Sequence, residues 1–157
     1  MILLLKNLLL VIIFPSVVFI LIPVFLLNHA SFYTEGFHLL GFLLLLPGAC
    51  ILLWCVWDFY NTGRGTPAPI DPPKVLVVKG LYRYMRNPMY VGILSVIIGE
   101  AILFFSWKIL LYAVCLGTFF QLMILFHEEP ELQRLFGASY EEYKQRVHRW
   151  MPRFSSK

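Results

Sequence analysis

The chain has 157 residues, of which 59% are hydrophobic and only 14% are charged, with a formal net charge of +4. A soluble domain usually carries about 25% charged residues, and apolar runs of about 20 residues are long enough to cross a bilayer as helices. The composition therefore excludes an ordinary soluble domain and indicates one compact helical membrane unit, with membrane lipids and no nucleic acid as partners. The three Cys residues lie in apolar runs without a CxxC or Cys/His cluster, so we expect neither a disulfide framework nor a metal site.

Two apolar runs in the N-terminal half predict two transmembrane helices. The first, about residues 8–27, contains Pro15 and Pro23 and is long for the core of a signal peptide. Asn28-His29-Ala30 is a poor cleavage site, so this run is interpreted as a retained, kinked helix. The second run, about residues 37–57, ends among aromatic residues typical of a membrane interface, Trp54, Trp57 and Tyr60.

Residues 58–87 form the longest polar segment and are predicted to be a cytoplasmic loop. The segment contains several prolines, which remove backbone donors and hold the chain extended, so a regular helix is excluded. No glycine-rich dinucleotide fingerprint of the GxGxxG type occurs in the sequence.

Two further apolar runs, about residues 88–105 and 107–126, have only Ser106-Trp107-Lys108 at their junction and predict a tight helical hairpin. After them, about residues 128–150 are predicted to form an amphipathic helix. Its apolar residues recur at intervals of three or four, which places on one helical face Leu132, Phe136, Tyr140, Tyr143 and Val147. The predicted fold is an all-α, polytopic membrane protein of one domain, residues 1–157, with four transmembrane helices and a C-terminal amphipathic helix.

The basic residues predict the orientation. Four crossings place every Lys and Arg except Lys108 on one side of the membrane. By the positive-inside rule that side is the cytoplasm, so both termini are expected there. We expect a bacterial inner membrane, because the sequence shows no targeting signal.

The segment Gly80–Gly92, GLYRYMRNPMYVG, combines charge, aromatic residues and backbone punctuation at a predicted membrane boundary. Asn87 is a good N-cap and Pro88 a good first helical residue, so a helix is predicted to start here with free N–H groups on the aqueous side. Such a helix start favours an anionic group, and Arg83 and Arg86 lie beside it. An interfacial anchor of Arg and Tyr residues is the alternative interpretation.

Acidic residues follow directly on the last apolar run. Glu128 and Glu129 would lie at the same membrane level as Arg83 and Arg86, and a site with both signs of charge suits a zwitterionic ligand. Capping or solvation of a helix junction is the structural alternative. Within the third run, Glu100 is predicted to lie beyond the membrane midplane, so a structural hydrogen bond or snorkelling is favoured over catalysis.

Two motifs in this order resemble the isoprenylcysteine carboxyl methyltransferase and phospholipid methyltransferase superfamily. GLYRYMRNPMYVG is similar to that family's G-x-Y-x-x-x-R-H-P-x-Y-x-G signature. EEPELQRLFGASYEEYKQRV, followed by Met151-Pro152, is similar to its acidic C-terminal motif. The two motifs and the hairpin between them cover about half of the chain, whereas the N-terminal half resembles the family only in having two membrane helices.

The resemblance implies a membrane enzyme that uses S-adenosylmethionine without a Rossmann domain. The cofactor pocket would lie at the cytosolic face, with backbone contacts and walls supplied by Val78, Lys79, Gly80, Tyr82, Arg86, Asn87, Pro88 and Tyr90, and with the acidic pair Glu128 and Glu129 near the amino acid end of the cofactor. The catalytic residues are unknown, with His127 and Tyr82 as weak candidates for a proton acceptor.

The sequence departs from the family pattern at two places. Asn87 stands where many members have His, which keeps hydrogen bonding but removes a titratable group. The eukaryotic prenylcysteine enzymes carry arginines just before the acidic pair, whereas residues 124–127 here are Ile-Leu-Phe-His. Recognition of an acceptor carboxylate by those arginines is therefore not expected.

The predicted function is methyl transfer to a lipophilic acceptor at the cytoplasmic membrane face, as by a carboxyl O-methyltransferase, with the acceptor entering sideways from the lipid between helices. In-line displacement at a sulfonium depends mainly on alignment of the reactants. Three alternatives remain: an N-methyltransferase for phospholipid head groups, an NADPH-dependent sterol-type reductase relative, and a non-catalytic membrane scaffold with the same fold.

Overall fold

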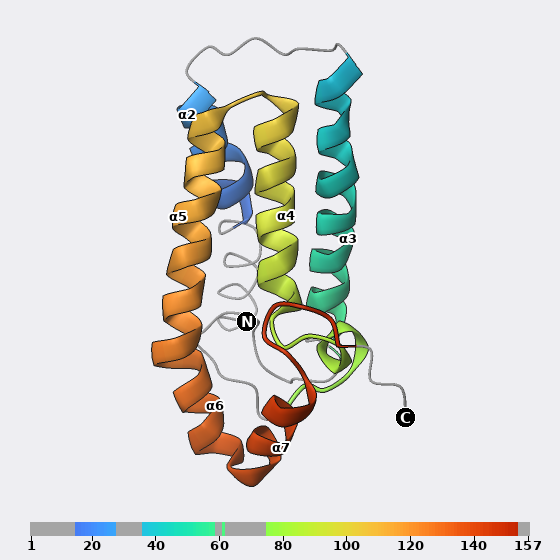
Figure 1. The fold of residues 1–157 in the computed structure, drawn as a ribbon, viewed down its shortest axis with the longest axis vertical. Coiled ribbons are helices and arrows are strands. Elements are labelled where there is room, and N and C mark those ends of the chain that lie inside the picture. Colours follow the sequence, from blue (N-terminus) through green and yellow to red (C-terminus); the bar gives the residue numbers. More distant parts are fainter. Residues whose placement is uncertain (1–14, 28–35, 59–60, 62–74, 154–157) are drawn as a thin grey trace, which may run out of the picture.

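The computed structural model describes residues 15–27, 36–58, 61 and 75–153, and every regular element in these ranges is a helix. Four helical segments lie side by side (Figure 1). The first joins η1 (Val17–Leu21) to α2 (Ile22–Leu27), and in the second η2 (Gly36–Gly41) leads into α3 (Phe42–Asp58). The helices α4 (Pro88–Leu103) and α5 (Trp107–Met123) form the predicted hairpin. The all-helical prediction is therefore confirmed for the described residues.

The last helix of the bundle runs on beyond the predicted boundary at residue 126. From α5 the chain continues through the π-turn η5 (Ile124–Glu128) into α6 (Glu129–Phe136), and α7 (Ala138–Arg146) then packs at the lower end of the bundle (Figure 1). The wide π-turn ends two residues before Pro130, whose missing N–H leaves the ordinary helical hydrogen bond unmade. The acidic pair is thereby placed on a continuation of a bundle helix.

The amphipathic segment predicted at residues 128–150 differs from a single helix. Gly137 has φ +51°, in the left-handed region that favours glycine, and it separates α6 from α7. Its carbonyl accepts a hydrogen bond from the Gln133 side chain at 3.2 Å. The chain then leaves the helix after Arg146, and residues 147–153 fold back along the segment that precedes α4. We call residues 147–153 the strap.

Glycines set the close approach of α4 to the η2–α3 segment. A Cβ atom on Gly41 would lie 2.5 Å from the Gly99 carbonyl oxygen, and one on Gly48 would lie 2.9 Å from that of Gly92. Two glycines seven residues apart on each partner thus allow backbone to pack on backbone.

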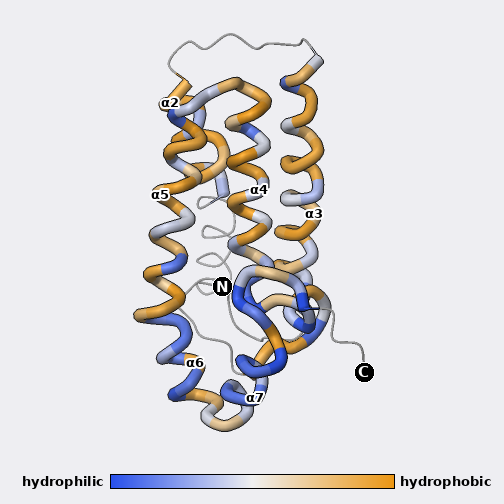
Figure 2. Tube along the Cα trace, in the orientation of Figure 1, coloured by the Kyte–Doolittle hydropathy of each residue, from blue (hydrophilic) through white to orange (hydrophobic). Residues whose placement is uncertain are grey.

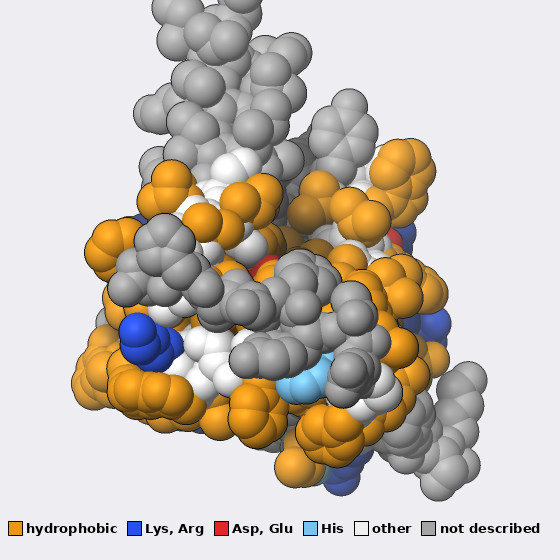
Figure 3. All heavy atoms as spheres, turned by 90° about the horizontal axis from the view of Figure 1, so that it is seen from above, with side chains coloured by type: hydrophobic (Ala, Val, Ile, Leu, Met, Phe, Trp, Pro, Cys, Tyr) orange, Lys and Arg blue, Asp and Glu red, His pale blue; other side chains and the backbone are white. Residues whose placement is uncertain are grey.

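Apolar side chains lie on the outer surface of the bundle as well as in its core. Figure 2 shows hydrophobic residues along α3, α4 and α5 and hydrophilic ones concentrated in α6, α7 and the strap. Seen from the end opposite to α6 and α7, hydrophobic side chains occupy much of the rim of the molecule (Figure 3). On α3, Leu53 is 72% exposed. Such a surface is expected of helices that face lipid.

Two helices in the described residues are long and apolar enough to cross a membrane, Gly36–Asp58 and Trp107–Phe136. The shorter apolar helices Val17–Leu27 and Pro88–Leu103 complete the bundle. Length and composition thus make a membrane protein plausible.

Glu100 lies inside the bundle, with 9% of its surface exposed. A snorkelling side chain would reach the surface, so the burial does not favour that prediction. Its Oε2 atom accepts no hydrogen bond from any described residue.

Candidate functional site

The turn η4 (Gly80–Arg83) begins the first motif and packs against the end of α3. Gly80 has φ +56°, in the left-handed region that favours glycine, and a Cβ atom there would lie 1.8 Å from Asp58 Oδ2, so a larger residue would also have to displace the Asp58 side chain. Tyr82 is buried in a cluster with Cys55 and Val77, and its hydroxyl is hydrogen-bonded to the Cys55 thiol. Burial raises the pKa of Tyr82 well above its ordinary value, which makes its hydroxyl a poor proton acceptor at neutral pH.

A cluster of charged residues lies where the start of α4 meets the start of α6. Arg86 Nη1 lies 3.1 Å from Glu129 Oε1. Arg149 binds the same carboxylate in a two-pronged arrangement, with Nε donating to Oε1 at 2.9 Å and Nη2 to Oε2 at 3.0 Å. Only 12% of the Arg86 side chain and 18% of that of Glu129 are exposed, so water screens this pairing less than it screens a surface ion pair.

The second acidic residue has a separate partner. Tyr90 donates a hydrogen bond from its hydroxyl to Glu128 Oε1. The Tyr90 ring stacks on Phe120, with centroids 4.4 Å apart and an interplanar angle of 29°. The stacking holds the hydroxyl toward Glu128, so the α4–α5 packing positions this carboxylate.

The strap joins the two motifs through backbone hydrogen bonds. Arg86 N–H donates to the His148 carbonyl at 2.8 Å, Asn87 N–H to the Arg149 carbonyl at 3.2 Å, and Arg153 N–H to the Tyr84 carbonyl at 2.9 Å. The segment before α4 therefore uses the N–H groups of Arg86 and Asn87 within the protein.

Several buried polar atoms in the charged cluster lack an internal hydrogen bond. Among the described residues, the buried atoms Arg86 Nε and Nη1 and Asn87 Nδ2 make no hydrogen bond of good geometry, although Nη1 is ion-paired with Glu129. The Asn87 side chain makes no cap hydrogen bond to α4. Buried donors without acceptors are costly, and these donors fit a carboxylate group of a ligand. Glu128 and Glu129 beside them fit a ligand ammonium.

The structure brings the predicted residues Arg86, Asn87, Tyr90, Glu128 and Glu129 into one neighbourhood. Pro88 is buried at the first turn of α4, while Val78 and Lys79 are exposed before η4. The exposed side chain of His127 lies on η5.

Arg149 is a member of the cluster that the sequence did not predict. The strap brings it to Glu129 from 20 positions further along the chain. The signal available in the sequence was a basic residue shortly after the apolar face of the last helix, which by itself is common.

The chain is similar in sequence to a known protein family and to several curated enzymes. A family model described as phospholipid methyltransferase matches residues 36–139. A probable protein-S-isoprenylcysteine O-methyltransferase of Oryza sativa subsp. japonica is 36% identical over 78 residues, 49% of this chain and 40% of that protein. Protein-S-isoprenylcysteine O-methyltransferase of Schizosaccharomyces pombe is 37% identical over 79 residues, 50% of this chain and 33% of that protein.

Protein-S-isoprenylcysteine O-methyltransferase B of Arabidopsis thaliana is 36% identical over 78 residues, 49% of this chain and 39% of that protein. The matched stretches thus cover less than half the length of these relatives. No solved structure matches the chain.

Proposed function

The chain belongs to the phospholipid methyltransferase family, and we propose that it transfers a methyl group from S-adenosylmethionine to the carboxylate of a lipophilic acceptor at the cytoplasmic face of a membrane. The observation that carries the proposal is the cluster of Arg86, Arg149, Glu128 and Glu129, held together with Tyr90. Two cations and two carboxylates, with unpaired buried donors among them, suit the charged amino acid end of the methyl donor.

We propose four crossings for the bundle. The segments η2–α3 and α5–α6 have the required length, and η1–α2 and α4 lie beside them as shorter apolar helices. The 16 residues of α4 extend about 24 Å at 1.5 Å per residue, somewhat less than a hydrocarbon core of ~30 Å. The basic residues of α6, α7 and the strap gather at one end, which the positive-inside rule assigns to the cytoplasm.

The residues of the site have distinct roles in this proposal. When bound, S-adenosylmethionine supplies an electrophilic methyl group. Arg86 and Asn87 would hold its carboxylate through their unpaired donors, and Glu128 and Glu129 would hold its ammonium group. Tyr90 would orient Glu128. These contacts fix the donor in one orientation, and alignment of two reactants contributes up to ~7–11 kcal/mol in well-oriented reactions.

A carboxylate acceptor fits the rest of the site. A carboxylic acid is ionised at neutral pH and needs no general base, which agrees with the buried hydroxyl of Tyr82 and the exposed position of His127. Arg149 offers a guanidinium group at the acidic pair although residues 124–127 contain no arginine. The curated relatives quoted above, by their names, are O-methyltransferases.

The first test is isothermal titration of the detergent-purified protein with S-adenosylmethionine and with its demethylated product, using NADPH as the control ligand. We expect the two sulfur ligands to bind and NADPH not to bind. Arg86→Ala and Glu129→Ala should each weaken binding at least tenfold. Arg86→Ala removes the donors proposed for the ligand carboxylate, and Glu129→Ala leaves Arg86 and Arg149 without the anion between them. Arg134→Ala and Glu141→Ala, which alter exposed ion pairs, are the matched controls. Wild-type affinity in both site variants would refute the assignment.

An N-methyltransferase acting on phospholipid head groups is the second candidate, because the matching family model is described as phospholipid methyltransferase. Radiolabelled methyl transfer separates the two. Label that alkali releases as methanol identifies a methyl ester, and label retained on an aminophospholipid identifies N-methylation.

A further inference from the structure

Asp58, the last residue of α3, carries a buried hydrogen-bond acceptor that no other described residue uses. Its Oδ2 atom is shielded from solvent and accepts no hydrogen bond from any described residue. A buried carboxylate oxygen without a donor is costly, and most such atoms in proteins have a partner. The Asp58 carboxylate therefore points to a donor group that the described part of the chain does not supply.

A second polar group without a described partner lies beside the same turn. Trp54 is one helical turn before Asp58 on α3, and its indole Nε1 would lie 3.1 Å from a Cβ atom on Gly80. The Asp58 Oδ2 atom would lie 1.8 Å from that same Cβ atom. The Trp54 indole makes no hydrogen bond with a described residue, and Trp54 is 54% exposed. An acceptor and a donor from α3 thus converge on Gly80.

Hydroxyl groups match this pair of side chains. A hydroxyl both donates and accepts hydrogen bonds, whereas a ligand ammonium only donates and a ligand carboxylate only accepts. The two neighbouring hydroxyls of a ribose also match the two oxygens of one carboxylate, and dinucleotide-binding proteins use an acidic side chain on a ribose hydroxyl in this way. S-adenosylmethionine carries a ribose in its adenosine part, away from its amino acid group.

Buried tyrosines connect Asp58 to the charged cluster. Cys55, one helical turn before Asp58, is hydrogen-bonded to the Tyr82 hydroxyl. The Tyr82 carbonyl accepts a hydrogen bond from the Tyr143 hydroxyl at 2.6 Å, and Tyr143 lies near Arg86. The turn η4 is therefore fixed at both ends, with Asp58 beside its first residue and Arg86 beyond its last. A ligand that lies along η4 can reach both side chains.

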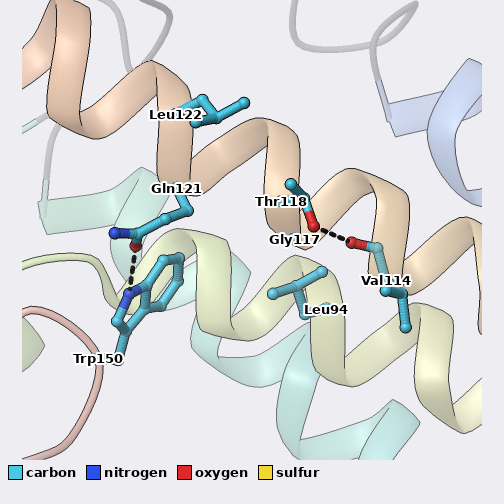
Figure 4. A pocket seen from close by; sticks show the side chains of 7 residues that line it. All are labelled: Leu94, Val114, Gly117, Thr118, Gln121, Leu122 and Trp150. Atoms are coloured by element: carbon cyan, nitrogen blue, oxygen red, sulfur yellow. Dashed lines mark hydrogen bonds between the residues drawn. The ribbon is translucent and has the colours of Figure 1, made fainter.

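The strap occupies the other side of the charged cluster. Trp150 Nε1 donates to Gln121 Oε1 on α5 at 2.8 Å, at the edge of an apolar pocket on the α4–α5 pair (Figure 4). The neighbouring Arg149 binds Glu129. For a ligand whose amino acid group lies at the cluster, this leaves the direction along η4 toward α3.

We propose that Asp58 and Trp54 bind the ribose hydroxyls of S-adenosylmethionine, with the Asp58 carboxylate as the acceptor and the Trp54 indole N–H as the donor. The inference rests on the proposed function and adds the residues that recognise the adenosine part of the methyl donor. It also explains the need for a glycine at position 80, because a side chain there would displace the Asp58 carboxylate.

The test is isothermal titration of the full-length, detergent-purified protein with three ligands. S-adenosylhomocysteine is the demethylated product, its 2′,3′-dideoxy analogue lacks both ribose hydroxyls, and 5′-methylthioadenosine lacks the amino acid group. We expect the wild type to bind the dideoxy analogue at least about fivefold more weakly than S-adenosylhomocysteine, because the hydrogen bonds to a charged carboxylate are lost. This comparison needs no variant to fold.

Variants assign the lost contact to its residue. Asp58→Asn keeps the size of the side chain and should weaken both S-adenosylhomocysteine and 5′-methylthioadenosine at least about fivefold, but the dideoxy analogue less than about twofold. Trp54→Phe should have a smaller effect of the same kind. Arg86→Ala should weaken S-adenosylhomocysteine and leave 5′-methylthioadenosine unchanged. Glu142→Gln makes the same carboxylate-to-amide change in an exposed ion pair and is the matched control.

The outcomes separate this inference from the proposed function. Equal affinity of the wild type for S-adenosylhomocysteine and its dideoxy analogue would overturn the inference alone. Equal losses for these two ligands in Asp58→Asn would also overturn it, because the lost contact would not be with the hydroxyls. If the folded wild type binds neither S-adenosylhomocysteine nor 5′-methylthioadenosine, the proposed function itself is refuted, and the inference with it.

Discussion

The Glu129 carboxylate is paired with the guanidinium groups of both Arg86 and Arg149. One negative charge thus lies between two positive charges. If Glu129 is removed, Arg86 and Arg149 face each other without the anion between them, and both are largely shielded from water. Like charges in such a place repel and their desolvation is uncompensated. Glu129 therefore holds the start of α4 and the strap together in addition to any contact with a ligand.

Tyr90→Phe separates the two roles of the Tyr90 side chain. The change keeps the ring that stacks on Phe120 and removes the hydroxyl that donates to Glu128. Loss of one such hydrogen bond costs about 0.5–1.5 kcal/mol, so we expect affinity for S-adenosylmethionine to fall by roughly 2- to 12-fold. Titration calorimetry measures the change, and Tyr112→Phe on α5 is a control outside the cluster. Full affinity in Tyr90→Phe would show that Glu128 does not need this hydrogen bond.

The two motifs were sufficient to predict Arg86, Tyr90, Glu128 and Glu129, and the structure brings these residues together. Arg149 was missed for a physical reason. Its contact with Glu129 depends on backbone hydrogen bonds between the strap and residues 84–87, and such pairing has no helical period that a sequence pattern can show. The pairing of Arg149 with Glu129 therefore depends on tertiary structure and could not be predicted from the sequence pattern.

At the scale of elements, the glycines between η2–α3 and α4 determine how closely the bundle packs. Gly99 illustrates the constraint, since a Cβ atom there would lie 2.7 Å from the Leu45 nitrogen and 2.8 Å from the Gly41 carbonyl oxygen. Backbone atoms cannot move away from a new Cβ atom as the end of a flexible side chain can. A larger residue at Gly99 would therefore force α4 and the η2–α3 segment apart.

Gly99→Ala should therefore destabilise the protein by ~1–3 kcal/mol, the usual cost of overpacking. Gly117→Ala is the matched control, because it adds the same methyl group where the contacts are ordinary. Thermal unfolding in detergent, followed by circular dichroism, compares the two. Equal unfolding temperatures would contradict the close approach of α3 and α4.

The strap provides a second prediction at this scale. A chain that ends after Arg146 lacks Arg149, Trp150 and the backbone bonds to residues 84–87, but keeps the elements η1 to α7. We expect it to retain its helical circular dichroism and to lose binding of S-adenosylmethionine by more than tenfold. A chain that ends after Arg153 is the control and should bind normally. Retained binding in the shorter chain would exclude the strap from the site.

Sequence periodicity gave the type and approximate bounds of α3, α4 and α5, because long apolar runs have few alternatives to helix. It did not give the end of the last helix. The apolar face at intervals of three or four residues continues through Val147, although Gly137 breaks the helix and the chain is extended at Val147. The spacing of apolar residues indicates which side chains are buried. A strap that is extended and buried on one side can continue the spacing seen in the helix before it.

At the scale of the whole molecule, the uneven distribution of charge predicts the orientation. Lys108 at the α4–α5 turn and Ser139 on α7 lie at opposite ends of the bundle and are exposed. In a variant without the native cysteines, Lys108→Cys should react with an impermeant thiol reagent added to intact cells, and Ser139→Cys should react only after the membrane is opened. The reverse pattern would place the site on the other face.

The strap also has a consequence for the order in which the molecule is made. The chain leaves the ribosome from its N-terminal end, so the helices of the bundle and the GLYRYMRNPMYVG segment are available before residues 147–153. At that stage the N–H groups of Arg86 and Asn87 have not yet formed their hydrogen bonds to the His148 and Arg149 carbonyls. Glu129 likewise lacks its ion pair with Arg149. In the proposed arrangement, the helices can insert into the membrane without the strap, whereas the candidate site is completed only after residues 147–153 have been synthesised. Under the proposed function, a nascent chain would therefore cross the membrane before it could bind S-adenosylmethionine.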